Sequence, residues 1–159
     1  MPPRAILVLL AVLPIGGAQA QTPVRYINPA GLSKPTGYTH VVVAGDGRTV
    51  YIAGQVAFDS AGQVVGGGDF KAQAEQVFTN LRVALASVGG SFSDVVKTTT
   101  LITDIKQIPV LREIRARYFN QEHPPANTII PTATLARGDL LIEIEAVAVL
   151  PAPLQLPTR

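Results

Sequence analysis

The sequence predicts an α+β fold in which a mixed β-sheet carries two helices on one face. Apolar residues recur at helical spacing over residues 70–88, and β-branched runs precede and follow this segment. The predicted order along the chain is two strands, a helix, a strand, a helix and two strands. Because strands that follow helices usually return through crossovers, we expect one mixed sheet with both helices on the same face.

The first twenty residues are expected to form a secretory signal peptide. Arg4 gives a basic start, "AILVLLAVL" an apolar run, and "AQA" at 18–20 a cleavage motif. We therefore expect an exported protein, periplasmic or secreted, that is free of the membrane after cleavage before Gln21. The chain contains no cysteine, which excludes disulfides and thiol chemistry. Its charges are scattered and form no basic stripe, so no nucleic-acid partner is expected.

The segment before the first helix is expected to hold a hairpin. Residues 21–37 are rich in Pro, Gly and Asn and should form an irregular lead-in. The β-branched runs "YTHVVVAG" and "TVYIAGQVAF" are separated by "DGR", which predicts a β-hairpin. Three glycines at 66–68 belong to a second turn region, which precedes Asp69. Asp69 is expected to cap the helix.

The helix over 70–88 should have one apolar face and end at Gly89-Gly90. "DVVKTTTLITDI" predicts a strand in which the threonines reflect strand propensity. "IPVLREIRARYFNQ" predicts a second helix, with Pro109 in its first turn and an apolar stripe through Leu111, Ile114 and Tyr118. Its arginines, Arg112, Arg115 and Arg117, are expected to lie on the solvated side. 

The last two predicted strands are "TIIPTATLA" and "LLIEIEAVAVL", joined as a hairpin by a turn at "RGD". In the final strand, alternation places Glu143 and Glu145 on one face with Leu141, Val147 and Val149. Both faces are largely apolar, and two helices can cover only one of them. We therefore expect the other face to meet a second copy of the protein.

Three segments resemble the signature segments of the reactive intermediate deaminase (RidA/YjgF-like) family: "YIAGQV", "DVVKTTTLITDI" and "IEIEAVAV". Their order and spacing match from roughly Tyr26 to Leu150, so residues 38–151 are interpreted as a RidA-like domain and 152–159 as a C-terminal tail. The resemblance implies a chorismate-mutase-like fold and a barrel-like homotrimer with small-molecule clefts between neighbouring subunits. It also implies hydrolysis of enamines and imines without a metal or other cofactor.

The resemblance further assigns roles to five positions. Glu143, the first glutamate of "IEIE", would position or deprotonate the attacking water. Tyr38 would lie at the cleft mouth, the backbone of Gly54 would approach the ligand, and Ile129 would make the floor apolar. Asn127 stands where active members carry a carboxylate-binding arginine. Because the asparagine is uncharged, this substitution argues against activity on 2-imino acids, at a cost of about a few kcal/mol.

Alternatives to catalysis remain open at this point. The clefts could bind a small ligand without turnover, or the trimer surface could have a structural or holdase-like role. Without the resemblance, Glu143 is better interpreted as an ordinary carboxylate at a sheet edge. Glu145 is expected to be structural and close to the trimer centre. His40 and His123, the two histidines of the chain, are far apart in sequence, so no metal site is expected.

Overall fold

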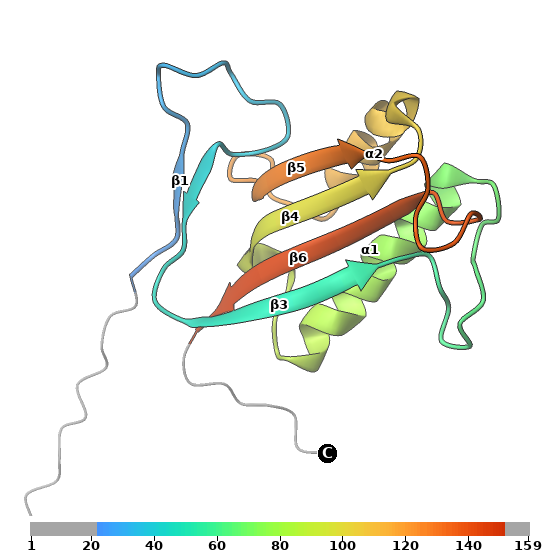
Figure 1. Cartoon of the computed structure of the whole chain (residues 1–159). Coiled ribbons are helices and arrows are strands. Elements are labelled where there is room, and N and C mark those ends of the chain that lie inside the picture. Colours follow the sequence, from blue (N-terminus) through green and yellow to red (C-terminus); the bar gives the residue numbers. More distant parts are fainter. Residues whose placement is uncertain (1–21, 152–159) are drawn as a thin grey trace, which may run out of the picture.

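Two layers, a β-sheet and a pair of helices, make up most of the molecule (Figure 1). The structure, a computed structural model, describes residues 22–151, so the predicted signal peptide at 1–20 and the tail at 152–159 lie outside the described residues. The elements are β1 (Arg25–Ile27), β2 (Val41–Val43), β3 (Arg48–Gln55), α1 (Phe70–Ser87), β4 (Val95–Ile102), α2 (Ile108–Arg115), β5 (Ala126–Pro131) and β6 (Ile142–Leu150). None of these helices is long and apolar enough to cross a membrane.

The main sheet has the strand order β3-β6-β4-β5. β4 and β5 run parallel, whereas β6 is antiparallel to both β3 and β4. The parallel pair follows from the crossover through α2, since parallel neighbours cannot be joined by a tight turn. Figure 1 shows α1 and α2 behind the same face of the sheet. The predicted α+β architecture is confirmed.

Neither predicted hairpin forms among residues 22–151. β2 pairs with β1 in a separate two-stranded ribbon, while β3 pairs with β6. The lead-in therefore contains a strand and is not wholly irregular. β5 and β6 are likewise not neighbours, because β4 lies between them. The turn sequences "DGR" and "RGD" are compatible with hairpins, but pairing across the whole domain determines the neighbours.

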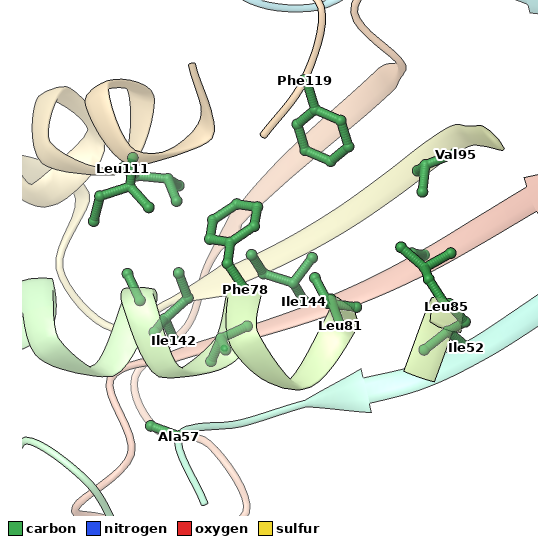
Figure 2. Packing of buried hydrophobic residues seen from close by; sticks show 14 of the residues in the cluster. Ile52, Ala57, Phe78, Leu81, Leu85, Val95, Leu111, Phe119, Ile142 and Ile144 are labelled. Atoms are coloured by element: carbon green, nitrogen blue, oxygen red, sulfur yellow. The ribbon is translucent and has the colours of Figure 1, made fainter. Parts of the chain in front are cut away.

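α1 begins and ends as the sequence predicts. The Asp69 side chain accepts hydrogen bonds from the backbone nitrogens of Lys71 and Ala72, at 2.9 and 3.2 Å, and thereby caps the helix. Gly89, which follows the helix, has φ +75°, a conformation that favours glycine. The buried face of the helix packs on the sheet, as Figure 2 shows for Phe78, Leu81 and Leu85 beside Ile144.

α2 is shorter than predicted and ends at Arg115. Tyr118 nevertheless joins the core, because its ring stacks on Phe78 with 4.5 Å between centroids. Phe119 also packs on Phe78, edge to face. The aromatic contacts therefore continue the apolar stripe beyond the end of the helix.

The strand β6 has one covered and one uncovered face. Its helix-facing side chains, from Ile142 to Leu150 at every second position, are buried, whereas Glu143 is half-buried and Glu145 is exposed. Register pairs Glu143 with Leu101 and Glu145 with Thr99, so these side chains share the side away from the helices. We call this side the uncovered face; it includes Thr49, Tyr51, Gly54, Lys97, Thr99, Leu101, Thr128, Ile130, Glu143, Glu145, Val147 and Val149.

Candidate functional site

Glu143 lies against Gly54 on the uncovered face. A Cβ atom on residue 54 would lie 2.7 Å from Cδ of Glu143, closer than side-chain atoms tolerate. The pairing of β3 with β6 is irregular between Ile52 and Gln55, where Gly54 lies. The glycine therefore leaves the space that the Glu143 carboxylate occupies. The resemblance implied that the backbone of Gly54 approaches the ligand. Within one chain, the close neighbour of Gly54 is the carboxylate of Glu143, the predicted catalytic residue.

Tyr38, Asn127 and Ile129 come together elsewhere, in a cavity of about 200 Å³ between α2 and β5. Asn127 and Ile129 pair with Thr98 and Thr100, two buried residues of β4, and so point toward the helices. The side-chain oxygen of Asn127 accepts a hydrogen bond from the Thr98 hydroxyl at 2.9 Å. The complete lining of this α2–β5 cavity is Thr36, Tyr38, Leu111, Arg112, Arg115, Asn127 and Ile129.

The five predicted site residues thus form two groups on opposite faces of one sheet. Gly54 and Glu143 belong to the uncovered face, whereas Tyr38, Asn127 and Ile129 line the α2–β5 cavity. β5, which carries Asn127, is an edge strand of the sheet. A single chain therefore does not bring the carboxylate and the cavity together.

Arg115 is the cavity residue whose environment the sequence analysis predicted wrongly. It was expected on the solvated side of its helix, but only 7% of its surface is exposed. Its Nη1 donates to the carbonyl oxygen of Gly37 at 2.8 Å, and its guanidinium lies 5.0 Å from the centroid of the Phe119 ring. The helical spacing indicates this burial, because residue 115 follows Leu111 by four positions and so shares its apolar stripe.

The electrostatic environment of this cavity is positive. Burial lowers the pKa of Arg115 to about 10, which still leaves the guanidinium protonated at neutral pH. Arg112, on the same wall of the cavity, is exposed. These cations favour an anionic ligand over a neutral one.

The loop at 36–40 closes one side of the cavity and is held from several directions. Thr39, which is buried, donates from its hydroxyl to the carbonyl oxygen of Pro124 at 2.6 Å. Gly37 has φ +74°, and its carbonyl oxygen accepts from Arg115. The position of Tyr38 therefore depends on contacts with both the α2 end and the chain entering β5.

The histidines have structural contacts. His40 lies 2.8 Å from the carbonyl oxygen of Ser33 through Nε2, and His123 stacks on Tyr26 with 5.1 Å between ring centroids. Within residues 22–151, no three His, Cys, Asp or Glu side chains are grouped to hold a metal ion.

Comparison with known proteins identifies the family. Residues 31–150 match the family model described as Endoribonuclease L-PSP. The human protein named 2-iminobutanoate/2-iminopropanoate deaminase is 42% identical over 103 residues, which are 64% of this chain and 73% of that protein. A crystal structure of a Yersinia pestis protein of the Rid family has a TM-score of 0.73 at 40% identity, covering 80% of this chain and 98% of that one. The chain therefore belongs to the Endoribonuclease L-PSP family, which is the RidA/YjgF family whose motifs its sequence resembles.

Proposed function

We propose that this protein is a homotrimeric deaminase that hydrolyses a small imine or enamine in clefts shared between subunits. One subunit would contribute Glu143 and Gly54, and its neighbour the α2–β5 cavity. The observation that carries this proposal is the location of the two groups on opposite faces of one sheet, since only a second subunit could combine them. The printed activity of the human relative supports the reaction class.

The chemistry requires one water and one carboxylate. Glu143 accepts a proton from the water while the water oxygen bonds to the C=N carbon. Glu143 returns this proton to the nitrogen, which gives a neutral carbinolamine. The carbinolamine hydroxyl then passes its own proton through Glu143 to the amino group, the C–N bond breaks, ammonia leaves, and the hydroxyl carbon becomes the carbonyl of the product. Glu143 is half-buried beside Gly54, so water reaches it while the strand holds its position. We assign no metal or cofactor to this reaction.

The test is ammonia release from freshly generated 2-iminobutanoate by the chain beginning at Gln21. The Glu143→Gln variant should lose at least a hundredfold in rate because it cannot accept the proton, a typical contribution of a general base. Glu113→Gln, the same change at an exposed position of α2 that does not line the cavity, is the matched control and should keep most of the rate. A protein that binds ligand in this cleft but never releases ammonia from any imine would instead be a non-catalytic binding module.

We further propose that the chain is exported and that its first twenty residues are removed. N-terminal sequencing of the protein from the periplasmic fraction of a Gram-negative host should begin at Gln21. A cytosolic protein that begins at Met1 would contradict this.

A further inference from the structure

Arg115 is a buried cation that has no carboxylate partner among residues 22–151. The ion pairs in that range join Arg117 to Glu75 and Arg137 to Asp139. All four of those side chains are about half exposed, whereas Arg115 is 7% exposed. Buried charges in proteins are ordinarily paired, because an unpaired charge loses its hydration without compensation. The unpaired guanidinium of Arg115 lies at the wall of a cavity. It therefore indicates that an anion from outside the described chain binds there and neutralises the charge.

The contacts of Arg115 leave donors for such an anion. Its Nη1 and Nη2 atoms donate to two neutral oxygens, of Gly37 at 2.8 Å and of Thr98 at 3.4 Å. A guanidinium has five N–H groups, so these two hydrogen bonds do not exhaust it. Arg115 also lines a second cavity of about 150 Å³, whose wall shares Thr36 and Arg112 with the α2–β5 cavity. Two hydrogen bonds therefore hold the guanidinium in place at the wall of both cavities.

Asn127 belongs to the same network. The Thr98 hydroxyl accepts from Arg115 and donates to the Asn127 side-chain oxygen, so a single threonine joins the two residues. The amide N–H groups of Asn127 remain as neutral donors on the cavity side that the asparagine lines. The resemblance implies an arginine at position 127 in active members of the family. In this chain the nearby cation is instead Arg115, on α2.

We propose that Arg115 is the carboxylate-binding residue of this chain, with Asn127 donating a hydrogen bond to the same carboxylate and Arg112 adding a second positive charge. This inference rests on the proposed function, because it names the substrate class of the same cleft. It revises the expectation that Asn127 argues against 2-imino acids. A cavity of about 200 Å³ is smaller than the usual sites for drug-sized ligands, which favours short-chain monocarboxylates.

The probe is 2-oxobutanoate, a stable keto acid, with butanone as its uncharged counterpart, and binding is followed by calorimetry. The natural protein should bind 2-oxobutanoate and should bind butanone at least tenfold more weakly. Arg115→Met should weaken 2-oxobutanoate binding at least tenfold, since a charge-assisted hydrogen bond is lost, and Arg115→Lys should recover part of the affinity. Arg117→Met, an exposed arginine two residues further on, is the matched control and should bind normally.

The outcomes separate this inference from the proposed function. Glu143→Gln should still bind 2-oxobutanoate, because Arg115 grips the carboxylate independently of hydrolysis. Binding of 2-oxobutanoate by the natural protein without turnover of 2-iminobutanoate would therefore support Arg115 and contradict the deaminase. Turnover of 2-iminobutanoate with unchanged KM in a folded Arg115→Met protein would overturn the role of Arg115 and leave the deaminase intact. Absence of 2-oxobutanoate binding by the natural protein would also overturn it. Thermal unfolding of each variant establishes that it is folded. If Arg115→Met does not fold, Arg115→Lys is compared with the natural protein instead and should bind 2-oxobutanoate more weakly.

Discussion

Asn127 and Arg115 hydrogen-bond to the same threonine hydroxyl, so their side chains cannot be considered separately. An uncharged amide at 127 allows the guanidinium of Arg115 to occupy the site without repulsion. A second guanidinium at 127 would place two like charges in one small cavity from which water is partly excluded. At an effective dielectric constant near 20, such a pair repels by on the order of a few kcal/mol.

We therefore expect Asn127→Arg alone to lower the free energy of unfolding by about 1 to 3 kcal/mol. The double variant Asn127→Arg, Arg115→Met should recover much of that loss, because it returns the site to one cation. Chemical denaturation of the natural protein, both single variants and the double variant gives the coupling energy between the two positions. Additive effects would mean that the two side chains act independently.

A second residue-scale prediction concerns Gly54. A methyl group there would displace the Glu143 carboxylate, and the backbone of Gly54 does not have the positive φ that would make alanine strained. Gly54→Ala should therefore reduce ammonia release at least tenfold while the free energy of unfolding changes by about 1 kcal/mol or less. Gly67→Ala, with no atom within 4 Å of the added carbon and no positive φ, is the control. Equal activity of Gly54→Ala and the natural protein would show that the carboxylate position is not critical.

The sequence identified these polar residues unevenly. Glu143 and Gly54 are adjacent in space and were both selected from their motifs, although their mutual contact was not foreseen. Arg115 was missed because charged residues are rarely buried, so the general rule outweighed the helical spacing from Leu111. Its burial depends on Gly37 and Thr98, which come from two other parts of the chain. Contacts over such sequence distances cannot be deduced from a local pattern.

At the scale of elements, Gln73 connects α1 to the start of β6. It is fully buried, its Nε2 donates to the carbonyl oxygen of Asp139 at 2.7 Å, and its Oε1 accepts from the backbone nitrogen of Leu141 at 2.8 Å. Leu141 lies two residues before Glu143, so this amide fixes where the final strand begins. The helical periodicity predicted the apolar residues on the buried face of α1 but gave no role to Gln73, a polar residue on the same face.

Gln73→Leu should lower the free energy of unfolding by about 1 to 3 kcal/mol, because it removes the fully buried amide that hydrogen-bonds to the Asp139 carbonyl oxygen and the Leu141 backbone nitrogen. Lys71→Leu, an exposed position in the same turn, should have little effect. Chemical denaturation measures both. A Gln73→Leu protein as stable as the natural one would mean that water replaces the amide.

The strands were predictable as elements but not as pairs. Alternation and β-branched content marked β3, β4, β5 and β6, and all four form. Their neighbours were assigned from turn sequences, which favoured two hairpins that the domain does not contain. Strand order depends on which faces the two helices cover, and this is a property of the assembled core.

At the scale of the whole molecule, the uncovered face is the surface that the described chain leaves without a second layer. Tyr51 is 80% exposed there and Ile130 42%, and Val147 lies opposite Tyr51 in the strand register. Glu143 is on the same face, so an interface formed there would also bring a neighbour close to the carboxylate. Assembly and activity should therefore be lost together.

Tyr51→Asp should convert the proposed trimer into monomers, because it replaces an exposed aromatic side chain beside Val147 with a charge that would be buried at the proposed interface. Light scattering after gel filtration should report a threefold lower mass, and ammonia release should fall in parallel although the circular dichroism spectrum remains that of a folded protein. The matched control is Val83→Asp, which introduces the same charge at a 64% exposed position of α1. If Tyr51→Asp remained a trimer with full activity, the subunits would have to meet through another surface. A different arrangement of subunits would then have to bring Glu143 to the α2–β5 cavity of a neighbour.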